Sequence, residues 1–508
     1  MGRVSEESDR RYRAVESRDA RFDGWFFTAV TSTGVYCRPS CPATTPKREN
    51  VRFYPSAAAA QQAGFRACLR CRPDAAPGSP EWNARADVVA RAMRLIADGV
   101  VDRDGVGGLA ARVGYSQRQL HRLLVAEVGT GALALARAQR AQTARLLVET
   151  TDLPVATVAF AAGFTSVRAC NDTFRHVFAT SPGELRRRAR RRTGAPPAPG
   201  TVTLRLAHRR PMAAGALLDF LAARAVPGVE GLVGADYHRS LRLPHGEGVV
   251  GISADGEGLR ATLRLGDLRD LTAAVNRCRR LCDLDADPVA VDATLAEDPL
   301  LAPLVLAVPG RRVPGTVDGW ELAVRAVIGQ QVSVAGARTV AGRLVAAAGS
   351  PLAAPDGPVT HLFPTPEQVL AAGDADLPMP AARRRALRAL AAAAGSGDLT
   401  VDPGADPAEV RRALTSLPGI GPWTAAYVAL RALGDPDAFL ETDLGVRRAI
   451  ARMGGAGDVT RAAERWRPWR AYATVHLWAA DGGSGSGGRE PRDAPGEGSG
   501  RKEREDAA

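Results

Sequence analysis

The stretch LTSLPGIGPWTAAYVALRAL, residues 414–433, places a short glycine turn before a helical pattern of apolar residues. Gly419 and Gly421 allow a tight turn between two helices, the arrangement called a helix-hairpin-helix. Backbone N–H groups at the start of the second helix suit a phosphate group. Short glycine turns are common, so this turn predicts a local structure and does not by itself decide a function.

Asp443 follows the hairpin in the segment AFLETDLGVRRAI, residues 438–450. It precedes a helical pattern at 444–452, which allows an N-cap role, because an Asp side chain accepts hydrogen bonds from the first backbone N–H groups of a helix. The alternative is a catalytic carboxylate, which stabilises developing positive charge or activates water. The residues leave both interpretations open.

Length and charge set limits on the whole chain. With 508 residues, three or four domains of about 100–200 residues each are expected. Lys and Arg number 67 and Asp and Glu 55, a net charge of +12. This excess favours a polyanionic partner, nucleic acid before membrane. Lysine occurs only at Lys47 and Lys502.

The sequence contains no apolar run of about 18 residues, so no membrane-spanning helix is expected. Residues 1–19 lack the apolar core of a signal peptide. We therefore expect a cytoplasmic, nucleoid-associated bacterial protein. In such a reducing compartment the seven cysteines should be metal ligands, nucleophiles or core residues rather than disulfides.

Four cysteines are close in sequence. Cys37 and Cys41 have C-x3-C spacing, and Cys68 and Cys71 have C-x2-C spacing. Such spacing is typical of a tetrahedral zinc site, and the alternative is four unrelated thiols. The surroundings are basic and would attract a phosphate backbone towards a zinc-bound thiolate; they contain Arg38, Lys47, Arg48, Arg52, Arg66, Arg70 and Arg72.

Residues 23–73, with the segments YCRPSC and ACLRC, resemble the zinc domain of Ada-type DNA methylphosphotriester repair proteins. The resemblance implies that Cys37 accepts a methyl group from a DNA phosphotriester and that all four cysteines hold one zinc. Thr44 stands where many relatives have Arg, so we expect Lys47 and Arg48 to bind DNA instead. Methylation makes the centre less negative and should raise its affinity for DNA.

Two similar helical units follow, at 106–129 and 154–178. Ser116 and Ser166 are N-cap candidates for the second helix of each unit. These second helices would carry Arg118, Arg122 and Arg168 into a major groove. The alternative is a plain helical bundle with polar faces.

The second unit has the spacing GF-x9-F-x3-F-x3-P, from Gly163 to Pro182. With the first unit it is similar to the AraC-type double helix-turn-helix module, which implies promoter binding over residues 85–192. The arginine run RRRARRR at 186–192 is either a solvated helix end or an additional phosphate contact.

Residues 201–480 resemble 3-methyladenine DNA glycosylase II of the AlkA type. The matching pieces are WELAVRAVIGQQVSVAGA (320–337), LPGIGPWTAAYVALRALG (417–434), AFLETDLGVRRAI (438–450) and ERWRPWRAYATVHLW (464–478). The resemblance implies that Asp443 is catalytic and that Trp423, Tyr427 and Trp478 bind a flipped base. A cationic alkylated base would stack on these rings by cation–π attraction of about 0.5–2 kcal/mol each.

The sequence departs from that family at two places. Gln331 replaces the usual intercalating leucine, and Glu441 and Thr442 stand where the prototype has a proline and another aspartate. Bifunctional relatives carry a lysine nucleophile at the position of Trp423, so the resemblance implies a monofunctional enzyme.

Other cysteine sites of related proteins are missing from the sequence. No cysteine follows Cys282, so the iron–sulfur loop of other hairpin glycosylases is absent, as is a PCHR-like alkylguanine methyltransferase site. Cys278 and Cys282 are one helical turn apart, and we interpret them as core thiols rather than as a metal pair.

These observations predict a multidomain α+β protein that repairs and senses DNA alkylation. The expected segments are a zinc domain (1–76), an all-α double helix-turn-helix (85–192), an α+β subdomain (201–310), an all-α helix-hairpin-helix glycosylase domain (311–481) and a disordered tail (482–508). Linkers are expected at 77–80 and 194–200.

We expect a monomer that binds one zinc ion and double-stranded DNA, both at damaged sites and at promoters, with RNA polymerase as a candidate partner. The alternative is a transcription regulator whose glycosylase half is only a DNA-binding scaffold, and a generic zinc-dependent DNA-binding protein is a third interpretation.

Overall fold

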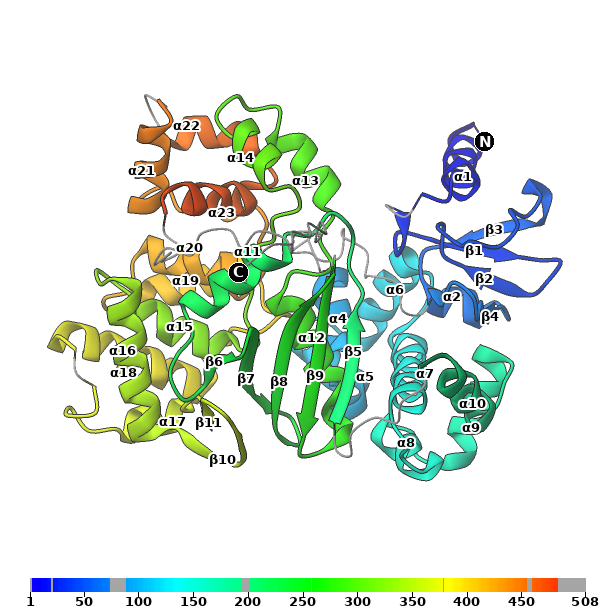
Figure 1. Cartoon of the computed structure of the whole chain (residues 1–508), viewed down its shortest axis with the longest axis horizontal. Coiled ribbons are helices and arrows are strands. Elements are labelled where there is room, and N and C mark those ends of the chain that lie inside the picture. Colours follow the sequence, from blue (N-terminus) through cyan, green and yellow to red (C-terminus); the bar gives the residue numbers. More distant parts are fainter. Residues whose placement is uncertain are drawn as a thin grey trace, which may run out of the picture.

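The computed structural model describes residues 2–19, 22–73, 88–193, 201–256, 258–377, 379–454 and 459–482. The two expected linkers and the expected tail beyond Gly482 lie outside these residues. Figure 1 shows a central sheet, with most of the N-terminal half on one side and the C-terminal helices on the other. This sheet has five strands. Within the described residues, no helix combines the length and the apolar character needed to cross a membrane.

The first region is a small mixed sheet with two helices. Its elements are α1 (Gly2–Glu16), β1 (Phe27–Val30), β2 (Val35–Cys37), η2 (Arg48–Asn50), β3 (Val51–Tyr54), α2 (Ala57–Gln62) and β4 (Arg66–Ala67). The strand order is β3-β1-β2-β4. Strands β2 and β4 run parallel, with Tyr36 opposite Ala67. The segments that follow these two strands therefore start at the same edge of the sheet.

The second region is helical. It consists of α4 (Val88–Ala97), α5 (Val100–Val113), α6 (Gln117–Val128), α7 (Ala132–Thr150), α8 (Val155–Ala161), α9 (Val167–Phe178) and α10 (Pro182–Thr193). Ser116 caps α6 by accepting from the Gln119 N–H, and Ser166 caps α9 by accepting from the Ala169 N–H. Both predicted N-caps are confirmed, and α7 joins the two helical units.

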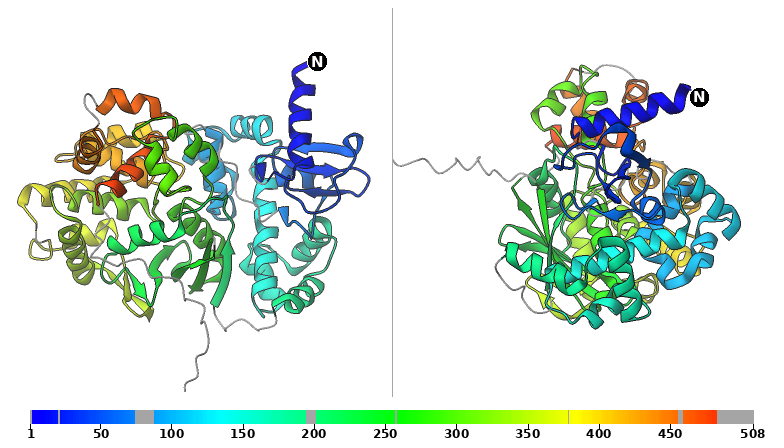
Figure 2. Two further views of the ribbon diagram at one scale, coloured as in Figure 1. Left: turned by 45° about the horizontal axis from the view of Figure 1, so that its top comes forward. Right: turned by 90° about the vertical axis from the view of Figure 1, so that its right-hand side faces the viewer.

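The third region is an antiparallel sheet in the order β5-β9-β8-β7-β6. It contains β5 (Thr201–Leu206), α11 (Ala214–Ala223), β6 (Glu230–Val233), β7 (Asp236–Leu243), β8 (Gly246–Asp255), β9 (Gly258–Leu265), η4 (Leu268–Asp270) and α12 (Leu271–Leu281). Cys278 and Cys282 are fully buried in and just after α12, as expected of core thiols. Figure 2 shows the sheet from two further directions.

The fourth region is mostly helical. It contains α13 (Pro288–Leu295), α14 (Ala302–Ala307), α15 (Gly319–Ile328), α16 (Val334–Ala348), β10 (Ser350–Asp356), β11 (Val359–Leu362), α17 (Pro366–Ala371), α18 (Ala381–Ser396), α19 (Pro407–Ser416), α20 (Pro422–Arg431), α21 (Leu444–Arg452), α22 (Val459–Ala463), η5 (Glu464–Trp466) and α23 (Arg470–Ala480). The β10–β11 pair differs from the expected all-α content. It forms beside the central sheet, where the Asp356 carboxylate lies 2.7 Å from His238 Nδ1 of β7.

A buried ion cluster fastens the central sheet to the fourth region. Arg239 of β7 donates to Glu230 at 2.8 Å and to Glu321 of α15 at 2.7 Å, and Arg325 of α15 donates to both carboxylates. Burial opposes ionisation of Glu230, but Arg325 and Arg239 lower its pKa to about 2. The charged groups of the cluster are paired with one another, and the cluster joins β6 and β7 to α15.

Helix α4 fastens the second region to the two regions that follow it. Arg94 donates to the Pro403 carbonyl at 2.6 Å. Asp98, nearly buried, lies 3.7 Å from Arg277 and 3.4 Å from Arg280 of α12. A hydrophobic core also runs through the first three regions, from Phe27 through α7 and α9 to α12. The expected domain boundaries stay a prediction, and these contacts cross them.

Candidate functional site

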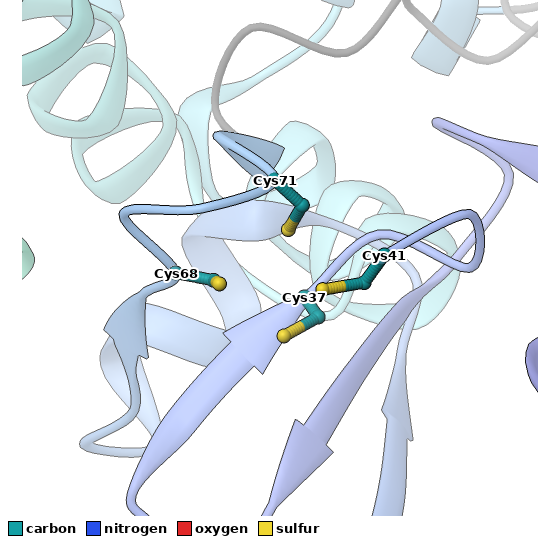
Figure 3. A group of neighbouring side chains, drawn as sticks. All are labelled: Cys37, Cys41, Cys68 and Cys71. Atoms are coloured by element: carbon teal, nitrogen blue, oxygen red, sulfur yellow. The ribbon is translucent and has the colours of Figure 1, made fainter. Parts of the chain in front are cut away.

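The four clustered cysteines meet at the edge where β2 and β4 end (Figure 3). Cys37 is the last residue of β2, and Cys68 follows β4 directly. Cys41 and Cys71 lie in the turns after them. The sulfur atoms all lie within 4.8 Å of one another, and all four cysteines are free of disulfides.

This arrangement fits a tetrahedral zinc ion. Zn–S bonds of about 2.3 Å place the sulfurs of a tetrahedral site about 3.8 Å apart, within the spread observed here. Hydrogen bonds among the four thiols lower the pKa of Cys41 and Cys68 and raise that of Cys37, and the pKa of Cys71 is also raised. The protons are thus shared unequally within the cluster, and zinc binding would displace those that remain, because zinc binds the thiolate form.

The loop between Cys37 and Cys41 is held by a single aspartate. Asp23 accepts from the Ser40 N–H at 3.0 Å and from its hydroxyl at 2.6 Å, and Arg38 lies 3.3 Å away. Burial raises the pKa of Asp23 above its usual value, against these partners. The Asp23 carbonyl accepts from Arg209 of the third region, so the loop is tied to the central sheet.

The two residues expected to bind DNA beside the zinc site differ in accessibility. Lys47 is exposed. Arg48 is half-buried, with its guanidinium 5.5 Å from the centre of the Tyr12 ring and 5.7 Å from that of Phe53. Asp9 of α1 lies 3.5 Å from Arg48. Helix α1 therefore holds Arg48, while Lys47 remains open to a partner.

Purified full-length protein should contain one zinc per chain. Replacing Cys68 or Cys71 by Ala should remove it, because three ligands leave the site incomplete and binding supplies about 10–16 kcal/mol to structural zinc sites. Metal analysis and a melting curve measure both effects. Cys170→Ala, at a buried thiol outside the cluster, should keep the zinc. A Cys68→Ala protein with a full equivalent of zinc would contradict the assignment.

The glycine hairpin of residues 417–421 joins α19 to α20. Gly419 has a φ of +77°, and a Cβ at that position would lie 3.0 Å from Ala386 Cβ, so both backbone angle and space require glycine. Gly421 caps α20 with extended backbone, and a Cβ there would meet open space. The backbone at position 421 therefore does not require glycine. The absence of a side chain there leaves the backbone N–H groups at the start of α20 accessible to a phosphate group.

Asp443 caps α21 and also contacts two indole rings. Its Oδ1 accepts from the Val446 N–H at 3.0 Å and from Trp478 Nε1 at 3.1 Å, and its Oδ2 accepts from Trp423 Nε1 at 3.0 Å. The N-cap interpretation is confirmed. The same bonds fix the half-buried carboxylate at an aromatic cluster, so the cap and a catalytic role are compatible. A Cβ at Gly445 would lie 3.1 Å from Oδ1, so glycine keeps this approach clear.

The three predicted aromatic residues come together around Asp443. Trp423 and Tyr427, one turn apart on α20, stack with ring centres 5.3 Å apart and planes 15° apart. Trp478 of α23 lies 6.1 Å from Tyr427. All three are half-buried, so part of each ring remains reachable from outside.

Three further residues of this cluster were not predicted from the sequence. Phe220 of α11 stacks on Trp478 with ring centres 6.1 Å apart. The Arg224 guanidinium lies 3.7 Å from the Phe220 ring centre, and burial lowers the pKa of Arg224 to about 10. Arg431 donates to the Tyr427 hydroxyl at 2.8 Å. Phe220 and Arg224 lie some 200 residues before Trp423, with no local motif that could have found them.

Gln331 lies in a strained turn next to the hairpin. Its φ of 55° is unusual for a residue with a side chain, and the residue is exposed. The neighbouring Gln330 anchors the turn, since its amide donates to the Gly419 carbonyl and to the Thr424 hydroxyl, both at 3.0 Å. The exposed Gln331 is thus fixed relative to the hairpin.

The arginines expected in a major groove are accessible. Arg118 and Arg122 are exposed on α6, and the Arg168 side chain at the start of α9 is 92% exposed. In the arginine run, Arg186 donates to the Leu153 carbonyl at 2.6 Å and Arg190 donates to Asp152. Between them, residues 187 and 188 are exposed arginines and remain candidates for phosphate contact.

Three family models match the chain. The metal binding domain of Ada matches residues 10–74, a helix-turn-helix domain matches 109–188, and the AlkA N-terminal domain matches 203–318. The first two ranges lie in the first and second regions of the fold, and the third covers the central-sheet region together with α13 and α14.

A protein of Mycobacterium tuberculosis (strain CDC 1551 / Oshkosh), named as a probable bifunctional transcriptional activator/DNA repair enzyme AlkA, is 55% identical over 479 residues, which is 94% of this chain and 97% of the relative. The chain belongs to this family. Members of this family join a transcriptional activator to a DNA repair enzyme, so the expected combination of regulation and repair is confirmed.

Two Escherichia coli (strain K12) proteins each match part of the chain. DNA-3-methyladenine glycosylase 2 is 38% identical over 273 residues, 52% of this chain and 93% of that protein. The bifunctional transcriptional activator/DNA repair enzyme Ada is 40% identical over 137 residues, 27% of this chain and 37% of that protein. The resemblances, the multidomain α+β fold and the single zinc site are thereby confirmed.

Proposed function

We propose that the protein excises alkylated purines such as 3-methyladenine from double-stranded DNA by hydrolysis, and that Cys37 accepts methyl groups from DNA methylphosphotriesters. The observation that carries the first activity is the Asp443 carboxylate held between the indoles of Trp423 and Trp478. The observation that carries the second is the cysteine cluster at the end of β2 and β4.

In base excision, the aromatic cluster binds the flipped, positively charged base by stacking and cation–π attraction. Asp443 lies beside it and stabilises the positive charge that develops on the sugar as the glycosidic bond breaks. The bonding electrons leave with the base, which becomes neutral. Water then bonds to the sugar carbon and gives its proton to the Asp443 carboxylate. The products are the free base and an abasic site.

In methyl transfer, the Cys37 sulfur attacks the methyl carbon of the phosphotriester. A carbon–sulfur bond forms, the carbon–oxygen bond breaks, and its electrons return the phosphate to an ordinary diester. Bound zinc keeps the cysteines deprotonated at neutral pH. Cys37 ends as a thioether, so the centre becomes less negative and repels DNA phosphate less. Promoter affinity should rise accordingly.

Methylated duplex DNA tests the proposed excision. The protein should release alkylated purines, and strands should break only after hot alkali or an added abasic-site nuclease. No lysine lies between Lys47 and Lys502, so no lysine amine of the glycosylase region can form a Schiff base. Borohydride added during turnover should trap no covalent adduct. An adduct would refute the hydrolytic mechanism, and absence of base release would favour the scaffold alternative.

We further propose the assignments that complete this function. Arg118, Arg122 and Arg168 contact promoter DNA, Gly419 and Gly421 present backbone N–H groups to the phosphate of damaged DNA, and Gln331 fills the space left by the flipped base. The protein acts as a monomer at the bacterial nucleoid, with RNA polymerase as a partner in activation.

A further inference from the structure

A cleft of 590 Å³ separates the zinc region from the central sheet. One wall is the loop between Cys37 and Cys41, through Arg38 and Ser40. The opposite wall, called the far wall below, is formed by the end of β5 and the segment after it, with Arg205, His208, Arg209 and Arg210. Asp287, which precedes α13, also lines the cleft.

The cleft is positively charged. Four arginines line it against two carboxylates, those of Asp23 and Asp287. Both carboxylates are already bound by donors: Asp23 by Ser40 and Arg38, and Asp287 by the Val289 and Ala290 N–H groups at the start of α13. Burial lowers the pKa of Arg209 to about 10, which leaves it protonated at neutral pH.

Two of these arginines stand on the outer part of the far wall. Arg205 and Arg210 are exposed. Arg205 lies 2.8 Å from Asp255, and its cross-strand neighbour Arg260 lies 3.0 Å from the same carboxylate. The single negative charge of Asp255 can neutralise only one of these two arginines, so a net positive charge remains at the rim of the cleft. On the near wall, Arg38 Nε is buried and has no hydrogen-bond partner among the described residues.

We propose that this cleft binds the DNA phosphate backbone beside the phosphotriester that Cys37 repairs. The central sheet then supplies part of the DNA-binding surface of the methyl acceptor, through Arg205 and Arg210. The inference rests on the proposed methyl transfer to Cys37. A phosphodiester fits because its anionic oxygens can accept from guanidinium groups on both walls.

The test compares two variants of the full-length protein. Arg205→Gln/Arg210→Gln removes the two rim cations, and Arg264→Gln is the control, since Arg264 is an exposed arginine of β9 that pairs with Asp356 and does not line the cleft. With methylphosphotriester duplex below saturation, the double variant should methylate Cys37 on the order of ten-fold more slowly. At saturating DNA its rate should equal that of the wild type, because the two cations serve binding.

Salt dependence gives a second measurement. The magnitude of the slope of log affinity against log salt should fall by about one for each phosphate that the protein no longer neutralises. It should therefore fall by about two in the double variant and stay unchanged in Arg264→Gln. Unchanged zinc content and base release would show that the variant is folded. A double variant with wild-type methylation rate and salt slope would overturn the proposal.

The two hypotheses fail in different ways. If wild-type Cys37 accepts no methyl group, the proposed methyl transfer is wrong. The cleft is then judged on unmodified duplex DNA, where a reduced salt slope in the double variant supports phosphate binding and an unchanged slope refutes it.

Discussion

Replacing Asp443 by Asn should slow the release of alkylated purines about 100- to 10,000-fold, the range for loss of a positioned acid–base group. The Asn oxygen can still accept from the Val446 N–H and keep the cap of α21. The charge that stabilises the sugar cation is lost, and an amide N–H₂ meets the Trp423 N–H. DNA binding should persist, since the hairpin is unchanged. Single-turnover base release and a DNA-binding titration measure both effects.

Trp423→Phe is the control for geometry. It removes the indole donor that contacts Asp443 Oδ2, keeps an aromatic ring on Tyr427, and leaves the carboxylate charged. We expect a loss of about five-fold, equivalent to one hydrogen bond of about 1 kcal/mol. If Trp423→Phe were as inactive as Asp443→Asn, the carboxylate would act through position rather than charge, and the proposed mechanism would be wrong.

Replacing Cys37 by Ser should abolish methyl transfer from methylphosphotriester DNA. In the wild type, mass spectrometry should find one added methyl group on the Cys37 peptide, once and irreversibly, because a thioether does not return its methyl group. The methylated protein should bind its promoter more tightly at low salt, and the gain should shrink as salt rises.

Cys170→Ala serves as the matched control for this experiment. Its buried thiol lies outside the cluster, so methylation of Cys37 should be unaffected. Methyl groups found mainly on another cysteine would overturn the assignment of the acceptor. Equal promoter affinity before and after methylation would remove the switch and leave the repair reaction intact.

The metal centre was predictable because its geometry is local. Each cysteine pair is fixed by a short turn, and the only tertiary requirement is that β2 and β4 pair side by side. The cap at Asp443 was equally local. Trp423 and Tyr427 share a helix face by their spacing alone, whereas Trp478 could be placed only by resemblance.

The remaining contacts depend on packing between distant segments. Phe220 contacts Trp478 because α11 packs against the fourth region. No short sequence pattern in α11 predicts this packing. The contacts of Arg48 with α1 arise from a helix that begins more than thirty residues earlier in the chain, and the expected role of Arg48 in DNA binding stays a prediction. The β10–β11 pair likewise forms against the neighbouring sheet, in a segment for which the sequence analysis predicted no strands.

The attachment of α4 to the segment near Pro403 and to α12 has a consequence for where repair takes place. If α6 binds promoter DNA as proposed, the aromatic cluster around Asp443 lies at a set distance and angle from that site. Two domains on a long tether would instead sample all DNA within reach. A promoter-bound molecule would therefore inspect one short stretch of neighbouring duplex, and the rest of the chromosome would be inspected by molecules not bound to a promoter.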